Sequence, residues 1–425
     1  MTTTSADVAT LQYRELAAAV RGDLIVPGDP GYDEARAVYN GMIDKHPAAI
    51  AQCRDTADVI TCVRFARAHG AEIAVRGGGH SAAGLGVADG ALVIDLSLLR
   101  STTVSPADHT VRADAGCTWA DVDHATVAFG MATPSGFVGS TGVAGLTLGG
   151  GIGYLSRRFG LTVDNLLAAD VVLADGTFVT ASQTSHPDLF WALRGGGGNF
   201  GIVTSFTFRC QDIGENGTII GGPVFYDLAD AAEVMRWYRE LHPSLPEELS
   251  GWIGLMTVPP VPPFPEALWG RKVCGIVWCY TGAHDKADEV LEPVRTYGSP
   301  LMMGMQPMPF NVLQSAFDAL YPAGLQCTGG RTSSTRSPTR RSTCTASTAR
   351  CCRPATPPCT CTPSTVQPAT CPPTRQPSPT ATAAGPASSR ASTPTPPTPT
   401  AFRNGPATTG RNYTRPQPAA RMSTS

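Results

Sequence analysis

Residues 327–425 contain no Asp, Glu, Lys, His, Ile or Leu. Apart from nine residues, this segment consists only of Ser, Thr, Pro, Ala, Arg, Gly and Cys. With 18 prolines and four large apolar residues, it cannot bury enough surface to offset a chain entropy of about 1–2 kcal/mol per residue. We therefore expect a disordered tail without a hydrophobic core from residue 327 onward.

A one-base slip in a GC-rich gene would produce the same residue set, because the G or C of the third codon position then falls in the middle of each codon. Back-translating residues 420–425 and regrouping the bases gives triplets that can encode Ala-Tyr-Val-Asn-Phe, an ordinary strand. We therefore interpret residues 327–425 as an out-of-frame product. The alternative is a Pro/Thr/Ser-rich linker, which has no reason to exclude acidic residues and lysine.

The net charge of the chain also changes sign at residue 327. The tail has 12 Arg and no acidic residue, whereas residues 1–326 have 20 Lys and Arg against 34 acidic residues, a net charge of −14. Such a charge argues against nucleic acid or an anionic membrane as a partner. The sequence has no run of 18 apolar residues, and its first residues lack the basic and apolar regions of a signal peptide, so we expect a cytoplasmic protein.

Cysteines are scattered and lack metal-ligand spacing. The seven in the tail have neither a CxxC pair nor a nearby histidine, so we predict no metal site there. We expect the six in the remainder to be free and buried: Cys53, Cys62, Cys117, Cys210, Cys274 and Cys279.

Short strands and helices alternate through residues 47–211. Residues 47–75 predict a strand, a helix capped by Asp55 or Thr56 and ended by Gly70, and a second strand. Residues 166–182 predict a hairpin with Asp175-Gly176 at its turn. The order predicts a mixed α+β fold and not the regular βαβ pattern of a dinucleotide fold.

A second unit begins near residue 212. Three strand patterns alternate with helical patterns near residues 228–242 and 284–297, which predicts an antiparallel sheet with helices on one face. The sequence FNVLQSAFDALY, residues 310–321, predicts one further helix.

Three glycine-rich turns carry the chemistry of residues 1–211: Arg76-Gly77-Gly78-Gly79-His80, which continues to Gly84, residues 140–154 and residues 194–201. Successive backbone N–H groups in such turns can converge on a phosphate, and glycine allows positive φ and close approach. None of the three fits GxGxxG between a strand and a long helix, or GxxxxGK[ST]. Nicotinamide binding on a Rossmann domain and P-loop chemistry are therefore disfavoured.

Three motifs in order resemble the flavin-linked oxidases of the berberine bridge enzyme type, in the p-cresol methylhydroxylase / vanillyl-alcohol oxidase superfamily. They are RGGGHSAAG, PSGFVGSTGVAGLTLGGGIGYLSRRFGLTVDNL and FWALRGGGGNFGIVTSFTF, and the resemblance covers roughly residues 35–326. It implies an FAD whose pyrophosphate lies on the first two glycine turns and whose 8α-methyl carbon is bonded to His80. The predicted cofactor-binding residues are His80, Arg76, Gly77, Gly78, Gly79, Ser81, Gly84, Ser140, Thr141, Gly142, Gly145, Gly150, Gly153, Gly201, Ile202 and Val203.

The resemblance also implies what the chain lacks. Some members bind the flavin a second time through a cysteine, and that position is Val138 here, while Cys117 lies elsewhere at a strand end. We therefore expect a mono-covalent flavin, attached by histidine alone. Members also close the active site with a C-terminal Tyr-x-Asn segment whose tyrosine helps to deprotonate the substrate. The out-of-frame Tyr-Val-Asn is that motif, so the catalytic base is unassigned in this chain.

The resemblance implies an α+β protein with a two-part FAD-binding domain of the p-cresol methylhydroxylase type at residues 1–211. A truncated antiparallel-sheet substrate domain follows at residues 212–326. The expected function is an FAD-dependent oxidase or dehydrogenase that removes hydride from an alcohol, sugar or amine carbon of a small molecule. Oxygen or another acceptor would then reoxidise the flavin. The alternatives are an inactive frameshifted product that at most binds flavin, and a Pro-rich interaction protein.

Overall fold

The first of the three main sheets combines one antiparallel and two parallel strand pairs. The computed structural model describes residues 13–262 and 264–326. The predicted strand, helix and strand at residues 47–75 are confirmed, with Asp55 accepting a hydrogen bond from the Asp58 N–H and Gly70 left-handed at the helix end. A later strand inserts between the two and pairs with both in parallel. The order is β1 (Asp23–Ile25), β2 (Ala49–Gln52), β4 (Leu92–Asp95) and β3 (Ile73–Arg76).

The second sheet is antiparallel and contains the predicted hairpin around Asp175 and Gly176. Its strand order is β5 (Thr102–Ser105), β6 (Thr110–Asp114), β10 (Ile202–Arg209), β8 (Leu166–Val172) and β9 (Phe178–Ser182). A two-stranded sheet pairs β7 (Met131–Ala132) with β11 (Gln211–Asp212).

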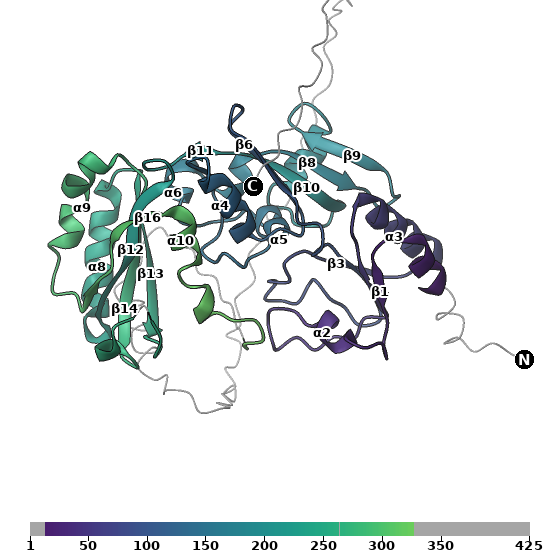
Figure 1. Ribbon diagram of the computed structural model, residues 1–425, viewed down its shortest axis with the longest axis horizontal. Coiled ribbons are helices and arrows are strands. Elements are labelled where there is room, and N and C mark those ends of the chain that lie inside the picture. The colour runs from purple at the N-terminus through teal and green to yellow at the C-terminus, as the bar shows by residue number, and fades with distance from the viewer. Residues whose placement is uncertain (1–12, 263, 327–425) are drawn as a thin grey trace, which may run out of the picture. The chain divides into compact units, whose positions relative to one another are not determined.

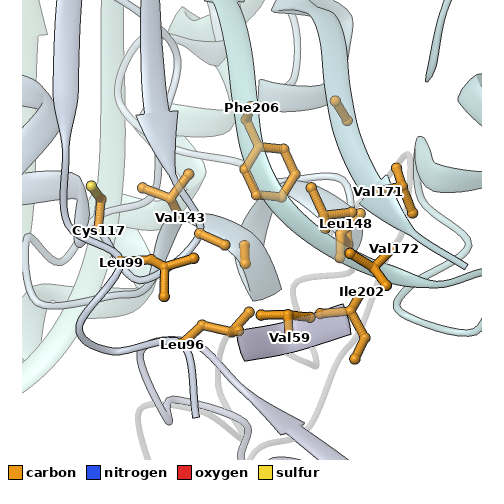
Figure 2. Close-up of a cluster of buried hydrophobic side chains, with 14 of the residues drawn as sticks. Val59, Leu96, Leu99, Cys117, Val143, Leu148, Val171, Val172, Ile202 and Phe206 are labelled. Carbon is orange, nitrogen blue, oxygen red and sulfur yellow. The ribbon is translucent and has the colours of Figure 1, made fainter. Parts of the chain in front are cut away.

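A shared hydrophobic core joins the first two sheets through the helices between them. Figure 2 shows part of it: Val143 and Leu148 point toward the cluster that holds Val172, Ile202 and Phe206. The helices of residues 1–211 are α2 (Tyr32–Arg36), α3 (Thr56–His69), α4 (Trp119–Val127), α5 (Val143–Leu148), α6 (Ser156–Phe159) and α7 (Pro187–Leu193), with residues 13–19 also helical.

The third sheet is antiparallel, as the sequence predicts. It consists of β13 (Leu249–Thr257), β14 (Lys272–Tyr280), β12 (Thr218–Asp227), β15 (Met302–Met303) and β16 (Gln306–Pro309), the last paired with β12. Helices α8 (Ala231–Leu241) and α9 (Ala287–Arg295) lie together against one face (Figure 1), where they pack on Ile276 and Trp278. On the opposite face, Val277 and Cys279 pack with Phe310.

The helix predicted over residues 310–321 is wrong in its length. Helix α10 covers only Phe310–Ser315, and a separate 3-10 turn, η6 (Asp318–Leu320), follows. Beyond the end of α10, the Asp318 carboxylate accepts a hydrogen bond from the Gly139 N–H. The other 3-10 turns are η1 (Thr162–Asn165), η2 (Leu228–Asp230), η3 (His242–Ser244), η4 (Glu266–Leu268) and η5 (His284–Lys286).

All described residues belong to one compact unit. The six cysteines in residues 1–326 are free and buried, as predicted. None of the helices within residues 13–262 and 264–326 is long and apolar enough to cross a membrane. The predictions of an out-of-frame, disordered tail fall on residues 327–425, outside the described residues.

Candidate flavin site

His80 lies at the end of the first glycine turn, which leaves strand β3 at Arg76. Gly79 has a positive φ of 70°, and its carbonyl accepts a hydrogen bond from the Tyr39 N–H at 3.1 Å. The Tyr39 ring stacks on the His80 imidazole with a centroid distance of 3.7 Å and an interplanar angle of 22°. The backbone and the aromatic contact together hold the His80 ring in one place.

Ser140 approaches His80 from the second glycine turn, with 3.2 Å between its Oγ and the His80 Nε2. The N-terminus of α4 holds this turn, because the Trp119 N–H donates to the Thr141 carbonyl and the Ala120 N–H to the Gly139 carbonyl. Burial lowers the pKa of His80, and a hydrogen bond with Ser140 acts in the opposite direction. The imidazole is therefore neutral at pH 7, the state in which one nitrogen keeps its lone pair.

The first two glycine turns lie backbone against backbone. An ideal Cβ on Gly78 would lie 2.5 Å from the Gly142 Cα, and one on Gly142 would lie 2.5 Å from the Gly78 nitrogen. Only glycine at both positions allows this approach. Because the two turns meet here, the backbone N–H groups of both can face one bound phosphate group.

A pocket of about 760 Å³ opens beside this junction. Its volume lies in the range of about 300–1,000 Å³ that is typical of ligand and cofactor sites. Its walls come from α2 and the segment after it, the end of β3, the first two glycine turns and the segment after α10. The lining residues include Tyr39, Arg76, Gly77, Gly78, Gly79, His80, Asp95, Ser140, Asp318 and Tyr321.

A buried ion pair forms one wall of the pocket. The Arg76 guanidinium donates to the Asp95 carboxylate at 2.8 Å, with side-chain exposures of 8% and 2%. Arg76 also donates to the Ala37 carbonyl, and Asp95 accepts from the Ser97 N–H. Each charge is therefore compensated, as buried charges require. Arg76 fixes the start of the first glycine turn by its side chain.

The other predicted cofactor residues do not line this pocket. Ser81 and Gly84 form the turn that follows His80, with the Gly84 N–H donating to the Ser81 carbonyl. Thr141 and Gly142 belong to the junction just described. The remaining predicted residues lie on α5 or beyond it, and their role stays a prediction: Gly145, Gly150, Gly153, Gly201, Ile202 and Val203.

Several of those remaining residues have a clear packing role. A Cβ on Gly153 would lie 2.3 Å from the Ser135 carbonyl oxygen, so Gly153 allows a close backbone approach. Ile202 and Val203 begin β10 and are buried in the core (Figure 2 shows Ile202). The Gly197 N–H of the third glycine motif donates to the Leu148 carbonyl, which ties that motif to the end of α5.

Cys117 and Val138 have different surroundings. Cys117 is fully buried; its thiol contacts the Thr102 hydroxyl at 3.6 Å, and burial raises the pKa of that thiol. Val138 is half-buried and accepts a hydrogen bond from the Thr141 N–H, at the start of the second glycine turn.

Sequence reasoning missed two pocket residues, Tyr39 and Asp318. Neither belongs to a motif, and each reaches the site through a contact between distant parts of the chain. The Tyr39 hydroxyl donates to the Tyr321 carbonyl, and the Gly324 N–H donates to the Tyr39 carbonyl. The Asp318 Oδ1 accepts from the Gly139 N–H across 179 residues.

The FAD binding domain family matches residues 47–182 of the chain. An FAD-linked oxidoreductase of Dictyostelium discoideum is 31% identical over 321 residues, covering 75% of this chain and 67% of that relative. The chain spans 57%, 65% and 43% of the lengths of three other curated relatives.

Solved structures of the same kind are similar to the chain. The 6-hydroxy-D-nicotine oxidase of Arthrobacter nicotinovorans has 27% sequence identity and a TM-score of 0.64, covering 72% of this chain and 66% of that one. A glucooligosaccharide oxidase of Acremonium strictum, with 6-S-cysteinyl, 8α-N1-histidyl FAD, has 26% identity and a TM-score of 0.62, covering 72% and 62%. With the glycine turns and the pocket, these likenesses show that the chain belongs to the FAD-linked oxidoreductases of the p-cresol methylhydroxylase / vanillyl-alcohol oxidase superfamily.

Proposed function

We propose that this protein is an FAD-dependent oxidoreductase that removes hydride from an alcohol, sugar or amine carbon of a small molecule. The observation that carries the proposal is the His80–Ser140 contact inside the pocket where Gly78 and Gly142 meet. The two solved relatives act, by their names, on an amine-containing compound and on an oligosaccharide, which supports both substrate classes.

The residues present fit a flavin dinucleotide. The glycine turns offer N–H groups to its phosphates, and the neutral His80 offers a nucleophilic nitrogen. Bound FAD would supply the acceptor for a hydride, while the protein supplies binding and orientation. The third sheet, which packs on α10 beside the pocket-lining segment, is the proposed wall of the substrate site.

His80 is the proposed covalent anchor. Its Nε2 faces the Ser140 hydroxyl and can donate a proton to it, which leaves the lone pair on Nδ1. We therefore assign the new bond to Nδ1 and the flavin 8α-carbon. Attachment of bound FAD through this nitrogen would be a two-electron oxidation, in which dioxygen would accept two electrons and two protons, one from the methyl carbon and one from the imidazole, and be reduced to hydrogen peroxide.

We propose that only one residue is bonded covalently to the flavin. The glucooligosaccharide oxidase carries a cysteinyl as well as a histidyl bond to its FAD. Here Val138 stands at the position of the second attachment, and valine cannot form a thioether. Cys117 is buried against Thr102 and Ser101, and burial disfavours its thiolate form, so it is a poor substitute.

The second candidate is a protein that binds flavin without turnover. The composition of residues 327–425 favours it, because this segment lacks the acidic residues, lysine and large aliphatic side chains that a substrate domain needs. Anaerobic mixing with a panel of sugars, alcohols and amines separates the candidates. Bleaching of the flavin absorbance supports the oxidoreductase, and an unchanged spectrum with every compound supports binding alone.

The cofactor assignment is tested by expressing the full chain, its His80→Ala variant and a control, His124→Ala, whose side chain is exposed on α4. After acid precipitation, the wild type and the control should retain yellow colour on the polypeptide, and His80→Ala should release it. Colour that leaves the wild type on denaturation contradicts the covalent bond, and a wild type purified without flavin contradicts the proposed function.

A further inference from the structure

Asp318 is a carboxylate from the last described segment that reaches into the flavin site. It begins η6 and lines the same pocket as His80 and Ser140. Its Oδ1 accepts a hydrogen bond from the Gly139 N–H at 2.7 Å, and its Oδ2 lies 2.7 Å from where a Cβ on Gly139 would be. The carboxylate therefore contacts the residue that precedes Ser140.

The contact adds a second hold on the segment that leads into the second glycine turn. The Gly139 carbonyl already accepts a hydrogen bond from the Ala120 N–H at 2.8 Å. With Asp318 on its N–H, Gly139 is held through both of its backbone polar groups. The next residue, Ser140, carries the hydroxyl that contacts the His80 imidazole at 3.2 Å. The orientation of His80 is thus linked to Asp318 through two hydrogen bonds and one backbone segment.

Helix α10 places Asp318 firmly. Phe310 and Leu313 are fully buried in the cluster that also holds Ala132 and Tyr154. The Gln314 side chain donates to the Gly136 carbonyl at 2.8 Å, three residues before Gly139. The segment that leads into the second glycine turn is therefore held at two points, Gly136 by Gln314 of α10 and Gly139 by Asp318 of η6.

Asp318 has a second acid, the buried Asp123 of α4, as its neighbour. Asp123 on α4 is completely buried, and within the described residues neither of its carboxylate oxygens has a hydrogen-bond partner. Burial raises the pKa of Asp123 well above its usual value, and the Asp318 charge raises it further. The pKa of Asp318 is also raised, because burial outweighs the Gly139 and Ser140 N–H groups, which act in the opposite direction. Of the two acids, Asp318 alone has donors that stabilise its ionised form.

We propose that Asp318 is a positioning residue for flavin attachment: by holding the Gly139–Ser140 segment, it orients His80 toward the 8α-carbon. The inference rests on the proposed function, because it assumes that His80 carries the flavin. It assigns to the α10–η6 segment a role in the maturation of the FAD site.

The test measures covalent flavin attachment in the full chain, reconstituted with FAD under air. The variants are Asp318→Ala, Asp318→Asn and, as a control, Asp285→Ala, an exposed acid before α9. Total bound flavin is read from the native spectrum, and the covalent part from the absorbance that stays with acid-precipitated protein. We expect Asp318→Ala to slow attachment by on the order of tenfold to a hundredfold, as small misplacements of reacting groups do. Asp318→Asn should recover most of the rate, because its Oδ1 still accepts from the Gly139 N–H.

A further variant disturbs the same contact by changing its other residue, Gly139. Gly139→Ala would place a methyl group against the Asp318 Oδ2 and displace the carboxylate, so it should slow attachment as Asp318→Ala does. Attachment at the wild-type rate in both variants overturns the inference alone. Equal slowing by Asp318→Asn and Asp318→Ala also overturns it, because the hydrogen bond would then not matter. If the wild type binds no flavin, the proposed function fails together with the inference. If it binds flavin but releases all of it in acid, the covalent bond and the inference fail, while the proposed oxidoreductase function does not.

Discussion

Gly78 and Gly142, from two turns far apart in sequence, approach so closely that neither has room for a side chain. An ideal Cβ on either residue would lie 2.5 Å from backbone atoms of the other. Because the opposing atoms are backbone, they cannot move aside as a flexible side chain would. The junction of the two turns, and with it the place of His80 beside Ser140, depends on both glycines.

Gly142→Ala should therefore separate the two turns and abolish flavin binding. Overpacking of this kind costs roughly 1–3 kcal/mol in the free energy of unfolding. The control is Gly254→Ala on β13, where an added Cβ meets no atom within 4 Å. Urea unfolding and flavin absorbance measure the two effects. Normal flavin binding by Gly142→Ala would show that the junction is not part of the cofactor site.

Replacing Arg76 by Met should destabilise the protein strongly, because Asp95 would remain as a buried charge without its partner. Breaking one side of a buried pair typically costs about 3–5 kcal/mol. The comparison is Lys45→Met, which removes an exposed pair with Asp89 and should leave the urea midpoint nearly unchanged. Equal midpoints for the two variants would mean that the Arg76–Asp95 pair carries no stability.

Flavin attachment should depend on pH through His80. Because burial lowers the pKa of His80, the folded protein favours the neutral imidazole. This contribution to stability is present above about pH 6.5, the usual histidine value, and is lost as the pH falls through the lower folded value. We expect the rate of covalent attachment to be constant above about pH 6.5 and to fall at lower pH. An attachment rate that begins to fall well above pH 6.5 contradicts this prediction.

Restoring the reading frame with one inserted base near codon 327 should restore turnover. The recovered Tyr-x-Asn segment would supply a positioned base, and loss of such a base typically costs on the order of 10²–10⁴ in rate. The two versions are compared by anaerobic flavin reduction with sugars, alcohols and amines. Equal activity of the uncorrected chain would mean that the altered sequence of residues 327–425 does not reduce turnover.

Local sequence patterns correctly predicted the helix ends and turns that are determined by neighbouring residues. Asp55 and Gly70 set the two ends of α3, and Asp175-Gly176 set the turn between β8 and β9. In β14, one set of alternate residues faces α8 and α9, and the other set faces α10. This alternation is what a sheet buried on both faces requires.

Contacts between distant segments could not be predicted in this way. The insertion of β4 between β2 and β3 depends on parallel pairing across the chain, which leaves no local pattern. Asp318 looks like one polar position in a helical run, yet its bond to Gly139 ends that run. Tyr39 belongs to no motif, and only the fold brings its ring onto His80.

Peptide mapping of the flavin by mass spectrometry tests the central claim most directly. The full chain is reconstituted with FAD, denatured in acid and digested, and the peptides that carry flavin mass are identified. We expect one modified peptide, the one that contains His80, and none that contains Cys117 or spans Val138. A flavin on the Cys117 peptide, or no flavin on any peptide of a protein that binds it, would contradict single attachment through His80.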